Sequence, residues 1–326
     1  MKFNKYIAFQ WLIFLINPVL SFFTSIYFLF KNKHSVLVLS LSLSLIFIYF
    51  PLMYDTSSNF YMTMGVANVT NYFNIRLYNL IPLFLHDSIN IQFMFVIFIY
   101  TAIILSVWFY IFKYYATLRE NKRMLLYMII FVISSLLYRS IMDLNRFYLS
   151  TSLVLLIIFI LEVELHKYKS YIYPYMLGLI ALLIHPSAAI LLLMYWASRN
   201  IKNQIFYIIW PIVLLFMGFF SGTILEFIIS LPYIDSLGKA LQLVGYISSD
   251  NKWGQVSSYG YGFVLRVLEI GIIALLYYKS IILLKISSKK TSIRFTLLLI
   301  GFVLFLLSFH ILYNRFSIAL FLLSAF

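Results

Sequence analysis

The run IQFMFVIFIYTAIILSVWFYIF occupies residues 91–112 and contains no charged side chain. It is long enough to cross a bilayer core of about 30 Å as one α-helix, which needs about 20 apolar residues. Lys113 follows directly, and Arg119, Lys122 and Arg123 come soon after it. An apolar segment of this length that ends in basic residues predicts a membrane-spanning helix.

Similar apolar runs recur along the chain, whose 326 residues are 63% hydrophobic and only 10% charged. We therefore predict an all-α, polytopic integral membrane protein that forms a single transmembrane domain over residues 1–326. The run 6–30 is longer than a signal-peptide core and ends in Lys31 and Lys33, which favours a retained first span. About 10 or 11 transmembrane helices are expected, with spans at 6–30, 35–53, 91–112, 124–138, 147–161, 171–184, 187–198, 204–220, 261–278 and 295–313, and a shorter apolar piece at 316–326.

Two long polar connections, at 54–90 and 221–260, determine the predicted orientation. If both face the same side, the short loops on the opposite side carry most of the basic residues. By the positive-inside rule that side is cytoplasmic, and the two long loops are periplasmic or extracellular. Lys2 and Lys5 then lie outside, against the rule. The inner set holds 15 of the 24 basic residues: Lys31, Lys33, Lys113, Arg119, Lys122, Arg123, Lys167, Lys169, Arg199, Lys202, Lys279, Lys285, Lys289, Lys290 and Arg294.

Four outer positions carry arginine, each at the outer end of a predicted span. Arginine keeps its charge and offers a planar fork for phosphate or carboxylate. Charge near membrane depth is costly and usually faces a cavity or a partner. We therefore expect an outward-facing cavity that binds an anion, lined by Arg139, Arg146, Arg266 and Arg315.

The stretch RSIMDLNR contains two of these arginines. If it is helical, Arg139, Asp143 and Arg146 lie at i, i+4 and i+7 on one face. They form either a self-neutralising ladder that caps two spans, or a site in which Asp143 orients the arginines toward a phosphate. One carboxylate against two guanidiniums leaves positive charge, which favours the phosphate site.

His185 lies between two apolar segments and directly precedes Pro186, which disfavours helix at the preceding residue. One interpretation is a histidine at a helix end that bonds a carbonyl. The other is a general base or a hydrogen-bond donor to substrate at the outer rim, because imidazole titrates near neutral pH.

The first long loop mixes aromatic and polar side chains, among them Asp55, Tyr61 and Arg76. Such a mixture suits carbohydrate, although tyrosines also gather at membrane interfaces without a ligand. The second long loop has a similar composition, and its stretch 233–247 is a candidate surface helix.

Several classes of site are excluded by the sequence. The net charge of +14 is spread over the loops, which argues against a nucleic-acid partner. With no cysteine and no HxxH or HExxH spacing, we expect no metal site. Phosphate-binding glycine motifs are also missing, and we expect no cofactor.

Residues 145–196, which begin NRFYL and contain LLIHPSAAI, resemble the Wzy/EpsG family of bacterial O-antigen and capsule polymerases. The shared features are an arginine that opens a span (Arg146), a basic inner turn (Lys167 and Lys169) and the His185-Pro186 break. Asp55 and Tyr61 are similar to an aspartate–tyrosine element of that family, and Arg315 in LYNRF to a late arginine. The family often has glutamine where this chain has Phe147.

This resemblance implies an enzyme of the bacterial cytoplasmic (inner) membrane that polymerises undecaprenyl-diphosphate-linked oligosaccharide repeat units on the outer face. His185, Arg146, Arg315 and Asp55 are then candidate catalytic residues. The candidate substrate-binding residues are Arg139, Asp143, Arg266, Tyr61 and Arg76. A chain-length regulator and a flippase are further candidate partners beside the lipid bilayer. An O-antigen ligase and a lipid-linked oligosaccharide flippase remain the alternatives.

Overall fold

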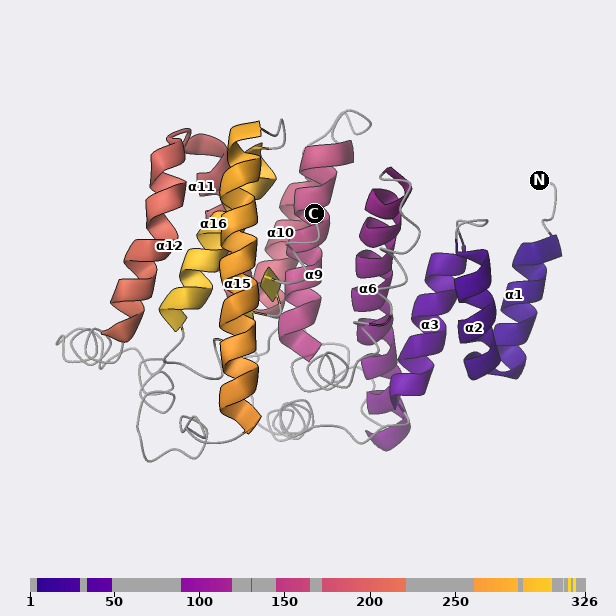
Figure 1. Ribbon diagram of the computed structural model, residues 1–326. Helices are drawn as coiled ribbons and strands as arrows, with labels where there is room; N and C mark the ends of the chain where they lie inside the picture. Colours follow the sequence, from indigo (N-terminus) through magenta and orange to yellow (C-terminus); the bar gives the residue numbers. More distant parts are fainter. Residues whose placement is uncertain are drawn as a thin grey trace, which may run out of the picture. The chain divides into compact units, whose positions relative to one another are not determined.

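The computed structural model describes residues 5–29, 34–48, 89–118, 130, 145–164, 172–220, 261–286, 290–306, 313, 316–317 and 319–320. Within these ranges every regular element is helical and none is a strand, so the predicted all-α class is confirmed (Figure 1). The chain forms two compact units, residues 1–190 and 191–326. Their boundary falls inside one helix, α11 (Ser187–Asn200).

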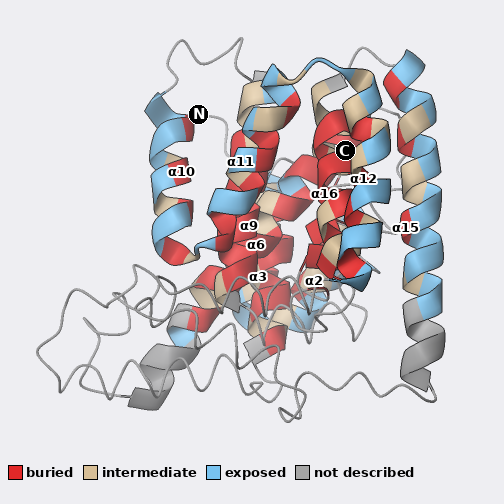
Figure 2. Cartoon of the chain, turned by 90° about the vertical axis from the view of Figure 1, so that its left-hand side faces the viewer, coloured by how far each residue is buried: buried red, intermediate tan, exposed pale blue. Residues whose placement is uncertain are grey.

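Three helices within the described ranges are long and apolar enough to cross a membrane: Ile97–Leu118, Arg146–Val163 and Val267–Ile286. Shorter apolar helices accompany them, and the protein is therefore a polytopic membrane protein. The first two of these spans are about half buried, whereas the third exposes most of its apolar surface (Figure 2). An exposed apolar helix in such a protein is suited to contact lipid.

The first unit begins with α1 (Lys5–Ile16), α2 (Pro18–Phe28) and α3 (Ser35–Ile48). Asn17 is extended and caps α2, since its Oδ1 accepts from the N–H groups of Val19 and Leu20. Pro18 occupies the first helical position, where its missing N–H costs nothing.

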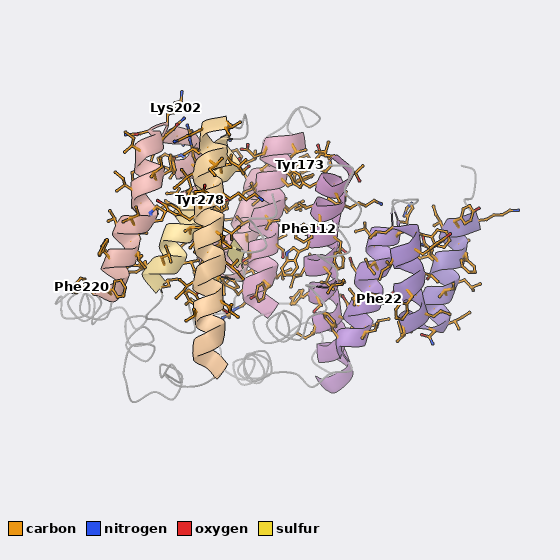
Figure 3. The ribbon with its side chains drawn as sticks, in the orientation of Figure 1. Phe22, Phe112, Tyr173, Lys202, Phe220 and Tyr278 are labelled. Atoms are coloured by element: carbon orange, nitrogen blue, oxygen red, sulfur yellow. The ribbon has the colours of Figure 1, made fainter. Side chains whose placement is uncertain are left out.

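The prediction of one span over 6–30 was therefore wrong. The rings of Tyr6 and Phe28 lie 5.7 Å apart, whereas a continuous helix would separate these residues by about 33 Å. The chain reverses at Asn17, so that α1 and α2 form an antiparallel hairpin. Phe22, which is labelled in Figure 3, lies in α2, the second arm of this hairpin.

Polar side chains hold the hairpin against α3. Gln10 Nε2 donates to Ser35 Oγ at 2.9 Å, and Ser42 Oγ donates to Ser21 Oγ at 2.9 Å. All four residues are fully buried. Such interhelical hydrogen bonds stabilise helix contacts in lipid, where water cannot satisfy the groups.

The longer helices of the first unit are α6 (Ile89–Leu118) and α9 (Asn145–Phe159), and α9 continues as the π-helical turn η2 (Ile160–Glu164). α6 packs against both α3 and α9. At the α6–α9 contact, Trp108 meets Tyr148 edge to face at 5.9 Å, and both side chains are fully buried. α10 (Ile172–Ile184) packs on α9 and ends at His185.

The second unit contains the rest of α11, then α12 (Gln204–Phe219), α15 (Tyr261–Ile286) and α16 (Lys290–Phe305). Lys202 and Phe220, labelled in Figure 3, lie just before and just after α12. Glycines let α12 approach α16 closely. A Cβ on Gly301 would lie 2.6 Å from Trp210 Cδ1, and one on Gly218 would lie 2.8 Å from the Leu304 carbonyl oxygen. Small residues at helix contacts in membranes serve this purpose.

Pro211 lies inside α12, and its ring removes a donor from the helical ladder. Nearby, Tyr277 of α15 donates its hydroxyl to the Ile208 carbonyl oxygen at 2.7 Å. This bond joins α15 to α12 one residue after Tyr207, whose carbonyl oxygen is the one that Pro211 cannot serve in the i→i−4 pattern.

Arg294, at the start of α16, is buried. Its Nη2 donates to the Lys202 carbonyl oxygen at 3.2 Å, and its guanidinium lies 5.6 Å from the centre of the Tyr207 ring. This contact brings the starts of α12 and α16 to the same end of the second unit. The short 201–203 connection and the first turn of α16 therefore lie on one side, which agrees with the predicted orientation of their basic residues.

The predicted bounds of most other spans agree within a few residues. The described helix α15 continues to Ile286, beyond the predicted 278, and α16 begins at Lys290 instead of 295. The long loops 54–90 and 221–260 fall outside the described residues except for 89–90, as does the predicted span 124–138 except for residue 130.

Candidate functional site

The best-defined candidate site of the first unit lies where α9 begins and α10 ends. Ser150, in the second turn of α9, donates its hydroxyl to the Ala181 carbonyl oxygen at 3.0 Å, and it lies 3.4 Å from the His185 carbonyl oxygen. Ser150 is buried. This bond brings the end of α10 against the start of α9, and with it the His185-Pro186 break.

The break at His185 has a defined hydrogen-bond pattern. The His185 N–H donates to the Ala181 carbonyl oxygen at 3.0 Å, which continues the ladder of α10. The His185 carbonyl oxygen then accepts from the Ala188 N–H at 3.1 Å, in the first turn of α11. Pro186, which has no N–H, sits between the two helices, so the chain reverses with few unsatisfied backbone groups.

The His185 side chain caps the start of α11. Its Nδ1 accepts from the Ser187 backbone N–H at 3.1 Å and lies 2.7 Å from Ser187 Oγ. An atom that accepts from a backbone N–H carries no proton. The Ser187 N–H therefore favours the neutral tautomer with its proton on Nε2, whereas the direction of the bond between Nδ1 and Ser187 Oγ depends on the tautomer.

This arrangement bears on the alternatives that the sequence left open. The Nδ1 atom of His185 accepts from the Ser187 backbone N–H, so this nitrogen caps a helix start. With its proton on Nε2, the neutral imidazole offers a hydrogen-bond donor at that nitrogen.

Phe147 supports the imidazole from α9. The two rings meet edge to face, 5.6 Å apart at 88°, and Phe147 is buried. Arg146 precedes Phe147 in the first turn of α9 and is half-buried. The structure thus brings Arg146 and His185, two of the residues predicted from sequence, to the same end of the helix pair.

The other predicted site residues cannot be located in the same way. Arg266 lies in the first turns of α15, in the second unit, but its side chain is outside the described part of the chain. The remaining predicted residues fall outside the described ranges: Asp55, Tyr61, Arg76, Arg139, Asp143 and Arg315.

Sequence reasoning gave no role to Ser150 or Ser187. Ser187 had one signal, because a small hydroxyl residue just after a His-Pro break is typical of a helix start. Ser150 had none, since its partner lies 31 residues away in the chain. For the metal prediction, no group of three or more His, Asp or Glu side chains is found in the described ranges.

Comparison with protein families supplies the decisive observation: residues 76–326 match the EpsG family. The chain belongs to the EpsG family. Membership of the EpsG family supports a function of the polysaccharide-polymerase type. No curated protein and no solved structure matches the chain.

Some of the candidate site residues lie inside the EpsG match, and others lie before it. The match includes Arg146 and His185, together with the helices from α6 to α16. Asp55 and Tyr61 precede residue 76, so their likeness to a family element is not supported by the match. The α1–α3 bundle also precedes it.

Proposed function

We propose that the protein polymerises lipid-linked oligosaccharide repeat units on the outer face of the bacterial cytoplasmic membrane. The observation that carries this proposal is the EpsG match over residues 76–326. The donor is a glycan on undecaprenyl diphosphate, and the acceptor is a single lipid-linked repeat unit. Both substrates are lipids, which fits a protein whose helices are apolar and membrane-spanning.

The reaction needs no nucleotide sugar, because the donor already carries a leaving group. A hydroxyl oxygen of the acceptor bonds to the anomeric carbon of the donor, and the bond from that carbon to the diphosphate breaks. The diphosphate leaves with the electron pair, and the hydroxyl proton passes to a carboxylate. Asp55 and Asp143 are the sequence candidates for that carboxylate.

Arg146 is the proposed ligand of the diphosphate. It opens α9 and is half-buried, so its charge is partly shielded from water and acts more strongly on an anion. A fixed guanidinium stabilises the negative charge that develops on the departing diphosphate. Arg139, Arg266 and Arg315 are further candidates on sequence grounds.

His185 is the proposed hydrogen-bond donor to a substrate oxygen. The Ser187 N–H holds the neutral ring in the Nε2-protonated form, and Phe147 packs against its edge. A donor that is already oriented costs little reorganisation during the reaction. His185 therefore positions the substrate instead of removing its proton.

The test is an Arg146→Ala variant in a chain-length assay. Membranes containing the variant are supplied with lipid-linked repeat unit, and the products are separated by size. We expect the rate of chain extension to fall by roughly 100- to 1000-fold, the usual effect of losing one donor to a developing anion. Single repeat units then accumulate.

Arg199→Ala is the matched control. Arg199 is an exposed arginine in the last turn of α11, and its removal should leave chain length unchanged. Long chains from Arg146→Ala at normal expression would overturn the role of Arg146. An unextended lipid-linked repeat unit with the unmodified protein would overturn the polymerase proposal itself.

A further inference from the structure

We infer that the α1–α2 hairpin is a re-entrant membrane element, which enters and leaves the bilayer on the cytoplasmic side and inserts into the acyl chains of the cytoplasmic leaflet. This inference does not depend on the proposed function. It concerns residues 5–28, which precede the part of the chain that matches the EpsG family.

The packing of the hairpin fixes where its two ends lie. The ring of Tyr6 in α1 packs against that of Phe28 in α2, tilted by 43°. Ser35, which opens α3, bonds Gln10 and donates to the Phe28 carbonyl oxygen at 3.1 Å. The Lys5 end of α1, the end of α2 and the start of α3 therefore lie together. Lys5 must lie on the same side of the membrane as the connection that carries Lys31 and Lys33.

The lengths of the helices decide how deep the hairpin goes. α2 has 11 residues and ends at both sides within the described chain, which gives it a length of about 16 Å. α1 has 12 residues, or about 18 Å. A bilayer core is about 30 Å thick and needs a helix of at least about 17 residues. Neither arm is long enough to cross.

The surface of the hairpin indicates its surroundings. Around the turn at Asn17, the exposed side chains are apolar: Leu15 is 77% exposed, Ile16 74% and Leu20 52%. Asn17 itself is exposed, but its Oδ1 is occupied by the N–H groups of Val19 and Leu20, while Gln10 and Ser21 are buried against α3. Apolar outside and polar inside is the pattern of a segment surrounded by lipid.

Charge supports the cytoplasmic side. With a single first span, Lys2 and Lys5 had to lie outside, against the positive-inside rule. A hairpin moves this end of the chain to the side of Lys31 and Lys33, and the exception disappears. The N-terminal basic residues and the α2–α3 connection then belong to one cytoplasmic cluster.

The chain has no cysteine, so single-cysteine variants test the inference directly. Lys5→Cys, Asn32→Cys, Asn17→Cys and Ser57→Cys are treated with a membrane-impermeant maleimide, first in intact cells and then in opened membranes. We expect Lys5→Cys and Asn32→Cys to react only in opened membranes. Ser57→Cys, in the predicted outer loop, should react in intact cells.

Asn17→Cys distinguishes a re-entrant hairpin from one that crosses twice. We expect it to react in neither preparation and only after detergent, because the turn lies within the bilayer core. Reaction of Asn17→Cys in intact cells would show a full crossing and overturn the inference. Reaction of Lys5→Cys in intact cells, with Asn32→Cys protected, would show a single span and also overturn it.

A second measurement uses the unmodified chain, in case the cysteine variants insert poorly into the membrane. A green fluorescent protein fused ahead of residue 1 of the unmodified chain should fluoresce, because it folds in the cytoplasm. A non-fluorescent fusion present in full length in the membrane would contradict the hairpin.

Discussion

At the scale of single residues, the candidate site depends on which nitrogen of His185 carries the proton. The Ser187 N–H donates to Nδ1, so the ring is a donor through Nε2. This assignment is set by the backbone at the start of α11. A donor and a base respond differently to substitution.

His185→Gln should retain much of the chain extension, because the glutamine amide still offers an N–H donor. His185→Ala should lose it by at least about 10-fold, since the substrate oxygen is left without its partner. The measurement is the rate of chain extension by membranes at matched expression. A base would be lost equally in both variants, so equal loss would contradict the donor role.

Ser187→Ala serves as the control for that pair. The variant loses the hydroxyl but keeps the backbone N–H that holds Nδ1. We expect Ser187→Ala alone to extend chains at close to the rate of the unmodified protein. When each His185 variant is combined with Ser187→Ala, His185→Gln and His185→Ala should differ as much as they do without it.

At the scale of helices, two glycines determine how closely α12 and α16 pack. Gly301 faces Trp210 and Pro211, and Gly218 faces the backbone of α16 at Leu304 and Phe305. Trp210 also donates its Nε1–H to the Leu298 carbonyl oxygen at 3.3 Å. Any side chain at position 301 must therefore displace the indole or the helix.

Gly301→Ala should destabilise the protein by about 1–3 kcal/mol, the usual cost of overpacking a well-filled contact. The added methyl would lie 2.6 Å from Trp210 Cδ1, well inside contact distance. The measurement is thermal unfolding of the detergent-solubilised protein, followed by tryptophan fluorescence.

Gly271→Ala is the matched control within α15. A Cβ there meets nothing within 4 Å, and alanine favours helix over glycine by about 1 kcal/mol. Its unfolding temperature should stay equal or rise. If both alanine variants unfolded alike, close packing at Gly301 would not matter to stability.

At the scale of the whole molecule, the surface of the described helices fits the lipid-linked substrates proposed above. The described helices are apolar outside, and polar groups are turned inward or toward helix ends. The Arg146–His185 region lies at one end of α9, which is typical of chemistry on one membrane face. Alternating access would instead place polar groups at mid-membrane depth.

Deletion of the gene distinguishes the proposed polymerase from its two rivals. We expect surface glycan of a single repeat unit, because units are still made and exported but not joined. The measurement is the size distribution of glycan extracted from the cell surface, with the restored gene as control. Unattached long chains would indicate a ligase, and repeat units retained inside would indicate a flippase.

Part of this protein was predictable because its causes are local. The apolar run 91–112 and the Lys113 that follows predict a span, and the structure has a helix from Ile89 to Leu118. The break at His185-Pro186 was predicted as well, since proline acts on its own neighbours. The arginine that opens α9 was visible as a charge at the end of an apolar run.

Other features depend on contacts between distant residues. Residues 6–30 form one continuous apolar run, and hydrophobicity alone does not show that the chain turns back at Asn17. Only the Tyr6–Phe28 and Gln10–Ser35 contacts show it.

The sequence by itself determined the class of protein, since about 20 apolar residues in a row must form a helix in lipid, where every backbone group needs an internal partner. The tertiary structure decided which helices reverse and which side chains meet. Those outcomes depend on packing energies summed over residues far apart in the chain, such as Ser150 with Ala181 and Gly301 with Trp210. No local pattern of hydrophobicity or charge contains that information.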